Sequence, residues 1–293
     1  MAKSTPAYAT GEWTSADGLT LRYRDYPGPK DGAPDRPAIL CLPGLTRNCR
    51  DFEALADAFA GEWRVICADL RGRGQSDYAK DPASYKPLQY LADVTALLDH
   101  AGLQRVVAVG TSLGGIVIML LAMTAPERIA GAVLNDVGPE IEATGLARIR
   151  EYVGQGRSFP TWVHAARGLR EQGGVAYPDY ELADWLRLAK RLMAVGPGGR
   201  IAFDYDMKIA EPFNAPEGAA PIDMWPAFRA LAGRPALAIR GELSDILSAA
   251  TLERMAREVP GLEVVTIPRI GHAPTLEEPQ AEAAIARLLA KAA

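Results

Sequence analysis

Long apolar runs are missing from this 293-residue chain. A membrane-spanning helix needs roughly 20 consecutive apolar residues. The best candidate, residues 116–125, is too short, and we expect it to form a buried helix. The first 14 residues are polar and lack the apolar core of a secretory signal peptide. These absences predict a cytoplasmic protein that has no membrane partner.

Charge of one sign and cysteine are also scarce. The net charge is −4 and neither sign forms a long run, so the sequence gives no indication of binding to nucleic acid or to an anionic membrane surface. The three cysteines, Cys41, Cys49 and Cys67, are odd in number and lack the spacing of metal ligands. Cys41 and Cys67 lie in apolar stretches, so we expect buried thiols there.

Strand-like and helix-like patterns alternate through most of the chain. The strand-like runs cover residues 38–42, 64–68, 105–109 and 129–134. The helix-like segments between and after them cover residues 51–60, 87–100 and 112–124. This order predicts an α/β fold in which helices cover both faces of a mostly parallel sheet.

The alternation stops between residues 137 and 221, where helical patterns continue without a clear buried strand. The amphipathic segments there cover residues 141–153, 161–171 and 180–194. A joint rich in glycine and proline at 196–199 is interpreted as a hinge through which this region opens. Strand and helix patterns then return. The sequence therefore predicts an α/β core formed by residues 1–136 and 222–293, with residues 137–221 as an inserted helical cap.

A Gly-Thr-Ser-Leu-Gly motif at residues 110–114 joins an apolar strand-like stretch to an apolar helix-like stretch. This pattern in a strand–turn–helix context is the nucleophile elbow. The turn is tight, so the residues beside the serine must be small, and glycine has no Cβ to clash. The turn raises the Ser112 hydroxyl above the sheet at a helix N-terminus, where developing negative charge is favoured. We interpret Ser112 as a catalytic nucleophile.

A serine nucleophile needs a base to accept its proton and an acid to orient that base. The chain has three histidines. His272 follows a strand-like run after a short loop, which places it at the carboxyl end of a strand, where ligands meet open parallel sheets. His100 ends a helical pattern and His164 lies in the cap, so capping or packing is expected of them. We predict that His272 is the base.

The orienting acid should lie on a loop at the same edge of the sheet. Asp245 follows the next strand-like run and gives the chain order serine, acid, histidine that the elbow motif predicts. Two alternatives stay open. Glu242 is closer to the strand end, where stabilising the loop is its expected role, and Asp136 ends the strand after the nucleophile helix, within reach of the histidine. Of the three, Asp245 is the predicted acid.

Acyl transfer also needs donors for the oxyanion. The backbone amide of Leu113, directly after the serine, is one predicted donor. The second is the amide of Leu45, in a loop where Gly44 lets the backbone approach closely. The glycine-containing segment 69–77 has no Walker lysine–serine pair, so it is interpreted as a structural turn whose charges brace the sheet.

Together these motifs resemble the α/β-hydrolase superfamily. The matching segments stand in the family's order and are residues 42–45, 69–76, 110–115, 241–245 and 271–272. The resemblance implies an eight-stranded sheet, a Ser–His–Asp triad, and no metal or cofactor. Ser112 differs from the elbow aspartate of relatives that open epoxides or displace halide. Pro43 replaces a histidine that many relatives have, and Ala273 replaces a tryptophan that is usual in carbon–carbon hydrolases.

The predicted function is hydrolysis of a carboxylic ester or lactone of a small, partly hydrophobic substrate through an acyl-enzyme. The cap is rich in aromatic residues, and of these Trp162, Trp185 and Tyr152 are the predicted pocket residues. One alternative is a carbon–carbon hydrolase or a cofactor-free perhydrolase that uses the same triad. Another is a small-molecule receptor on the same fold.

Overall fold

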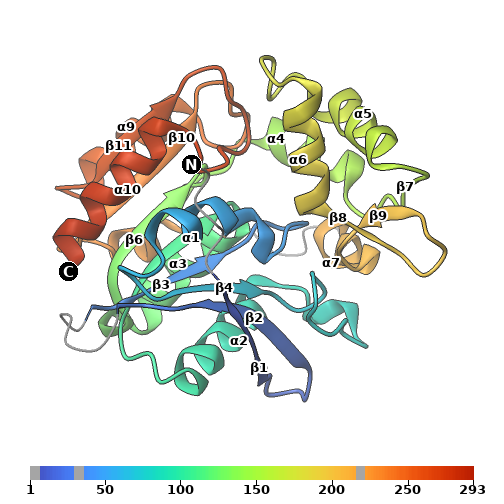
Figure 1. Cartoon of the computed structure of the whole chain (residues 1–293). Coiled ribbons are helices and arrows are strands. Elements are labelled where there is room, and N and C mark those ends of the chain that lie inside the picture. The colour runs from blue at the N-terminus through green and yellow to red at the C-terminus, as the bar shows by residue number, and fades with distance from the viewer. Residues whose placement is uncertain (1–6, 30–35, 216–221) are drawn as a thin grey trace.

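The computed structural model describes residues 7–29, 36–215 and 222–293. Its central feature is an eight-stranded sheet with the spatial order β1-β2-β4-β3-β5-β6-β10-β11 (Figure 1). In chain order the strands are β1 (Ala9–Thr14), β2 (Thr20–Tyr26), β3 (Ala38–Leu42), β4 (Val65–Asp69), β5 (Val106–Thr111), β6 (Ile129–Asn135), β10 (Ala236–Gly241) and β11 (Glu263–Ile267). Neighbours from β4 to β11 pair in parallel, and β2 is antiparallel to β1 and β4. The predicted sheet is confirmed.

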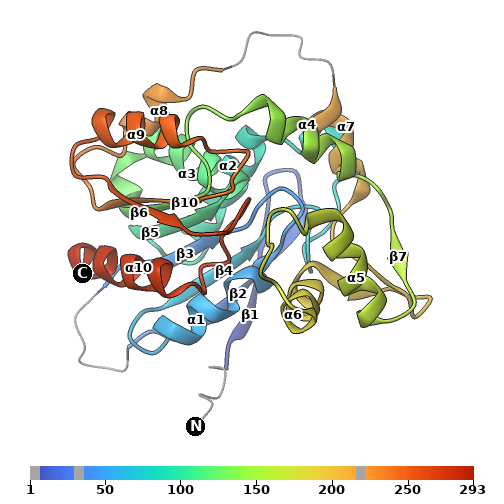
Figure 2. The same cartoon turned by 90° about the horizontal axis from the view of Figure 1, so that it is seen from above.

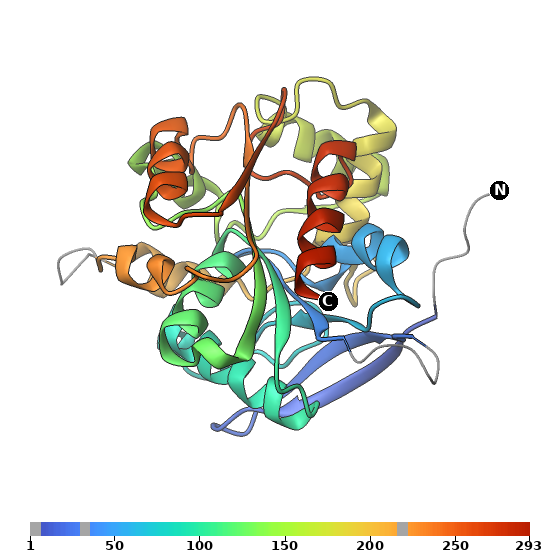
Figure 3. The same cartoon turned by 90° about the vertical axis from the view of Figure 1, so that its left-hand side faces the viewer.

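Helices cover both faces of this sheet, as Figures 2 and 3 show. One face carries α1 (Glu53–Phe59) and α10 (Pro279–Ala292). The other carries α2 (Pro87–His100), α3 (Leu113–Thr124), α8 (Trp225–Arg229) and α9 (Ala249–Glu258). Short 3-10 helices also occur, and these are η1 (Cys49–Phe52), η2 (Pro82–Ser84), η3 (Pro126–Arg128) and η4 (Met207–Ile209). No helix in the described ranges is long and apolar enough to cross a membrane.

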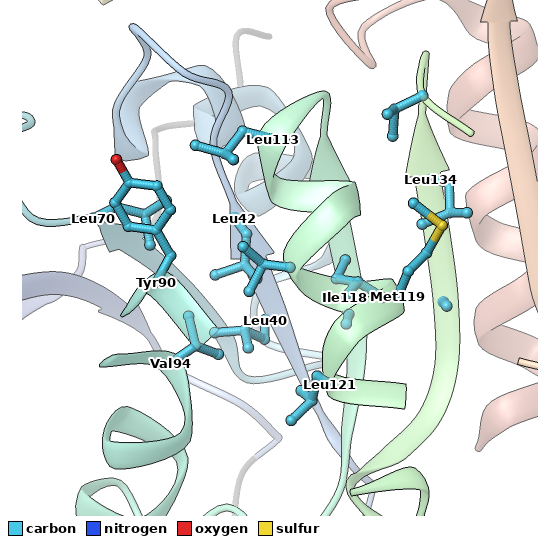
Figure 4. Packing of buried hydrophobic residues seen from close by; sticks show 14 of the residues in the cluster. Leu40, Leu42, Leu70, Tyr90, Val94, Leu113, Ile118, Met119, Leu121 and Leu134 are labelled. Carbon is cyan, nitrogen blue, oxygen red and sulfur yellow. The ribbon is translucent and has the colours of Figure 1, made fainter. Parts of the chain in front are cut away.

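The central strands are buried on both faces, which explains their continuous apolar sequences. All five residues of β3 are buried. Because side chains alternate across a strand, Leu40 and Leu42 pack on the α2 and α3 side, whereas Ile39 and Cys41 pack on the α1 and α10 side. Figure 4 shows Leu40 and Leu42 among the buried side chains beside α3. The helix that carries the elbow serine at its N-terminus is therefore fixed by core packing.

The order of the strands reverses between β3 and β5. The two strands are neighbours, but β4 lies on the outer side of β3 and β6 lies on the outer side of β5. Loops that leave the carboxyl ends of such strands diverge and leave a crevice between them. The loop after β3 and the elbow after β5 are the two predicted oxyanion segments, so the topology brings them together.

Residues 137–215, which we call the cap segment, differ from the expectation of helices alone (Figure 1). The cap segment contains α4 (Ala143–Tyr152), α5 (Trp162–Gly173), α6 (Leu182–Leu192) and α7 (Ala210–Asn214). It also contains an antiparallel sheet in the order β7-β9-β8, formed by β7 (Ser158–Phe159), β8 (Met193–Val195) and β9 (Ile201–Phe203). These strands have two or three residues each, too few for a recognisable alternation. The boundaries 137 and 221 stay a prediction, and residues 216–221 lie outside the described residues.

The backbone corrects one further sequence interpretation and adds one strand that was not expected. The glycine- and proline-rich joint at 196–199 is the turn of the β8–β9 hairpin, closed by a 2.8 Å hydrogen bond from the Gly196 amide to the Arg200 carbonyl. It is therefore a tight turn and not a hinge between cap and core. Strand β1 was not predicted, because Trp13 is its one buried residue and small or polar residues fill most other positions.

Candidate active site

The elbow turn places Ser112 directly between β5 and α3. Ser112 has a φ of 52°, a left-handed conformation that is uncommon for a residue with a side chain. A Cβ added at Gly110 would lie 2.4 Å from the Gly114 backbone, and one added at Gly114 would lie 2.1 Å from the Leu42 carbonyl oxygen. The two motif glycines are therefore required by close packing, as the sequence predicted.

The structure brings His272 to the elbow. Its Nε2 atom lies 3.0 Å from Ser112 Oγ. The histidine follows β11, and its loop is held from the cap segment by Tyr177. The Tyr177 hydroxyl accepts a 3.1 Å hydrogen bond from the Ala273 amide and donates a 2.8 Å hydrogen bond to the Ala273 carbonyl. The Gly271 amide also donates to the Ala176 carbonyl at 2.6 Å. The cap segment thus fixes the backbone that carries the histidine.

Asp136, and not Asp245, contacts the imidazole. Asp136 Oδ2 lies 2.7 Å from His272 Nδ1, and the carboxylate is fully buried. It also accepts a 2.8 Å hydrogen bond from the Gly241 amide and a 2.7 Å hydrogen bond from the Ser244 hydroxyl. Three donors therefore fix a buried carboxylate against the ring, which is the arrangement that a charge needs when it is removed from water.

The predicted contact between Asp245 and His272 is wrong. Asp245 forms a bidentate ion pair with Arg148 of α4, with Nε–Oδ2 and Nη2–Oδ1 distances of 2.5 Å and 2.7 Å. Burial raises the pKa of Asp245, but the hydrogen bonds and charge of Arg148 outweigh burial, so this pKa is lower than usual. In the loop after β10, the neighbouring Ser244 points toward Asp136 and Asp245 points to the cap segment. The other alternative, Glu242, accepts a 2.7 Å hydrogen bond from the Arg269 amide and holds the loop.

The predicted oxyanion donors lie on segments that meet at the elbow. Leu113 is the first residue of α3, so its amide has no partner within the helix. Leu45 directly follows Gly44. A Cβ added to Gly44 would be 3.7 Å from Ser112 Cβ. The buried Arg73 holds this loop, because its Nε atom donates a 2.9 Å hydrogen bond to the Leu45 carbonyl. The 69–77 segment therefore braces the loop that carries Leu45, in agreement with its structural interpretation.

A cavity of about 140 Å³ opens beside Ser112 and His272. Of the predicted pocket residues, Tyr152 and Trp185 line it. Trp162 does not; it packs against the buried cluster of the cap segment and is corrected to a packing residue. Apolar side chains from the core and from the cap segment also line the cavity, and these include Leu45, Phe52, Ile149, Leu169, Leu188, Leu192 and Phe203.

Three arginines in the cavity wall were missed by the sequence analysis. They are Arg47, Arg148 and Arg191, and Asp51 also lines the cavity. Arginine is common on protein surfaces, and their positions in sequence carry no motif, so only the fold reveals their convergence. Tyr177, which holds the histidine loop, lacks a sequence signal for the same reason.

The remaining predicted residues lie away from the chemistry. His164 Nδ1 is 2.8 Å from Thr161 Oγ1 at the N-terminus of α5, where both are exposed, and His100 ends α2. Cys41, Cys49 and Cys67 are buried free thiols. Among the residues that the structure describes, no group of three His, Cys, Asp or Glu side chains could hold a metal ion.

Known proteins resemble this chain in sequence and in structure. A family model described as the alpha/beta hydrolase fold matches residues 37–279. The chain is 34% identical over 263 residues to the 3-hydroxybutyrate-oligomer hydrolase of Cupriavidus necator, which covers 87% of this chain and 89% of that protein. It is 28% identical over 237 residues to the 2-(acetamidomethylene)succinate hydrolase of Mesorhizobium japonicum, with coverage of 80% and 81%. The crystal structure of an alpha/beta hydrolase from Novosphingobium aromaticivorans superposes with a TM-score of 0.92 at 62% identity, covering 98% of this chain and 99% of that chain.

Proposed function

The chain belongs to the α/β-hydrolase fold family and is a hydrolase, and from that premise we propose that it cleaves carboxylic esters or lactones through an acyl-enzyme on Ser112. The observation that carries the proposal is the unbroken series of contacts from Ser112 Oγ to His272 Nε2 at 3.0 Å and from His272 Nδ1 to Asp136 at 2.7 Å. This geometry suits proton transfer from the hydroxyl to the imidazole.

In the proposed mechanism, Ser112 attacks the substrate carbonyl while His272 accepts its proton. Asp136 keeps the Nδ1 proton of the imidazole in place and stabilises the imidazolium that forms. The amides of Leu45 and Leu113 bind the oxyanion, since both belong to segments that meet at the elbow. His272 then donates its proton to the leaving alcohol. In the second half of the reaction it activates water, which releases the acid from Ser112.

The cavity favours a small, partly hydrophobic substrate, because its volume is about 140 Å³ and many of its wall residues are apolar. The similarity to a 3-hydroxybutyrate-oligomer hydrolase makes short hydroxy-acid esters the first substrates to test. A cytoplasmic location and the absence of nucleic-acid and membrane partners stay predictions.

A panel of short-chain esters, hydroxy-acid dimers, lactones and a vinylogous diketone tests the proposal with the wild type and Ser112→Ala. We expect ester or lactone turnover that Ser112→Ala reduces by at least about 10³-fold, since the triad acts as a unit. Ester turnover that survives this change would refute the proposed nucleophile. Turnover of the diketone alone would indicate a carbon–carbon hydrolase, and peroxyacid formation would indicate a perhydrolase. Ligand-induced stabilisation without any turnover would indicate a receptor.

A further inference from the structure

The cavity wall carries more arginine than carboxylate side chains, because Asp245 and Glu277, the partners of Arg148 and Arg191, lie outside its described lining. Arg47, Arg148 and Arg191 line the cavity, whereas Asp51 supplies the one carboxylate in its described lining. A cavity that received only an apolar acyl chain would gain nothing from buried guanidinium groups, because removing them from water is costly. We propose that Arg47 and Arg191 bind a free carboxylate group of the substrate.

Arg47 lies beside the elbow and is oriented toward the cavity by Asp51. Its Nε and Nη2 atoms donate to the two carboxylate oxygens of Asp51 at 2.6 Å and 2.9 Å. A Cβ atom added to Gly44 would lie 3.2 Å from Arg47 Cγ and 3.7 Å from Ser112 Cβ. A guanidinium has five N–H donors. Asp51 therefore fixes the direction of Arg47 through Nε and Nη2, and Arg47 lines the same cavity as Ser112.

Arg191 lies on the cap segment, in the last turn of α6. Its carbonyl accepts hydrogen bonds from Asn48 Nδ2 at 2.9 Å and from Arg50 Nε at 3.0 Å, so the core holds its backbone. Its side chain is 12% exposed and pairs with Glu277. Burial, together with the positive charge of Arg47, lowers the pKa of Arg191 in spite of the opposing effect of Asp51. An added carboxylate would relieve this desolvation and repulsion.

Arg148 differs from this pair. Both oxygens of Asp245 accept its hydrogen bonds, and the Tyr152 hydroxyl is a further partner. Its side chain is also 37% exposed, so water solvates it in part. Arg148 is therefore a partly solvated member of an ion pair, whereas the side chains of Arg47 and Arg191 are only 25% and 12% exposed.

The inference rests on the proposed function and narrows its substrate class to esters that also carry a carboxylate. Because Arg47 follows the oxyanion loop, it can bind this carboxylate while the ester carbonyl lies at Ser112. Planar guanidinium groups match carboxylate geometry and give directional, charge-assisted hydrogen bonds. The subsite would therefore fix the position of the substrate and select substrates that carry a negative charge.

The test compares kcat/KM for the dimeric ester 3-hydroxybutyryl-3-hydroxybutyrate with that for its primary carboxamide, which lacks the charge. We expect the wild type to prefer the acid by roughly 10- to 100-fold, in keeping with hydrogen bonds to a charged group. The double variant R47M/D51N removes the cation without leaving a buried carboxylate unpaired, and it should bring this ratio close to 1. Arg191→Met should lower the ratio in the same direction. The matched control R148M/D245N removes an ion pair from the same cavity and should leave the ratio unchanged.

A second measurement does not depend on turnover. Titration calorimetry of butyrate and butyramide with the wild type and the same variants should show tighter binding of butyrate, lost in R47M/D51N and kept in R148M/D245N. If the wild type binds butyrate and butyramide equally tightly and cleaves the acid and the carboxamide with equal kcat/KM, the carboxylate subsite is overturned. A loss of the kcat/KM preference for the acid in R148M/D245N would also overturn it. If no ester is cleaved but butyrate binding still depends on Arg47, the proposed function fails and the subsite stands.

Discussion

Two core aspartates near the active site are held in different ways, one by the core and one by the cap segment. Asp136 is fully buried and accepts hydrogen bonds from His272, the Ser244 hydroxyl and one backbone amide. The side chain of Asp245 is 33% exposed and pairs with Arg148 of α4 in the cap segment. A buried carboxylate with three donors has one stable arrangement, whereas a partly exposed ion pair is solvated and weaker.

This difference separates the expected roles of the core and the cap segment. The core contributes the side chains of Ser112, His272 and Asp136, which lie in hydrogen-bond contact at one edge of the sheet. The cap segment contributes aromatic and apolar wall residues, Tyr152 and Trp185 among them. We therefore expect changes on the core side to reduce the rate for every substrate, and changes on the cap side to alter the preference between substrates.

The largest effect should come from Asp136→Asn. The amide keeps the size of the side chain but cannot accept the Nδ1 proton at its nitrogen, so the imidazole is held in the wrong tautomer or loses its partner. We expect kcat for a neutral short-chain ester to fall on the order of 10⁴-fold. The measurement is steady-state turnover, with circular dichroism as the control for folding. Near-normal turnover would remove Asp136 from the mechanism.

The two tryptophans of the cap segment provide a matched pair. Trp185 lines the cavity and is 1% exposed, whereas Trp162 packs within the cap segment. We expect Trp185→Leu to shift the preference between acyl chain lengths by about 1–3 kcal/mol, as the loss of pocket contacts does in other enzymes. Trp162→Leu should leave the preference unchanged. The values of kcat/KM over a series of ester chain lengths distinguish the two, and an equal loss at all lengths for Trp185→Leu would contradict a role in selection.

Ser244→Ala should have a smaller effect on the core side. The change removes one of the three donors to Asp136 but leaves the contact with His272. A hydrogen bond to a charged group contributes about 1.5 kcal/mol, so we expect a roughly 10-fold loss in kcat. Ser244→Thr keeps a hydroxyl and should recover part of that loss. If alanine and threonine give the same rate, the hydroxyl does not position the acid.

Much of this site could be predicted from the sequence because it depends on where strands end. The apolar run of β5 and the glycines after it placed Ser112, and the run of β11 placed His272 at the same sheet edge. The choice between Asp136 and Asp245 could not be predicted in this way, because both follow adjacent parallel strands. It depends on the local turn after β10, where the Ile246 and Leu247 amides donate to Ser244 Oγ and direct the next side chain to the cap segment.

The fold shows the same division between what pattern predicts and what packing decides. Buried central strands such as β3 have continuous apolar sequences, and their prediction succeeded. The edge strand β1 and the two- and three-residue strands of the cap segment lack such runs, and they were missed. The lining of the cavity was predicted only in part, since Trp162 and Trp185 both lie in amphipathic helices and only tertiary packing decides which one faces the cavity.

Asp245→Asn should give the smallest effect on turnover of a neutral ester. The negative charge of Asp245 lies near enough to His272 to interact with it, but no hydrogen bond joins them in the described structure. We expect kcat to change by less than about threefold, because a partly exposed charge interacts weakly through solvent. The comparison with Asp136→Asn on the same substrate quantifies the difference between the two aspartates.

The most direct test of the central claim, that Asp136 and not Asp245 activates the nucleophile, is the rate at which a fluorophosphonate modifies Ser112. This rate is followed by intact-protein mass spectrometry and needs no knowledge of the natural substrate. We predict that Asp245→Asn is labelled within about threefold of the wild-type rate, whereas Asp136→Asn is labelled at least on the order of 10²-fold more slowly. Slow labelling of Asp245→Asn together with normal labelling of Asp136→Asn would contradict the account.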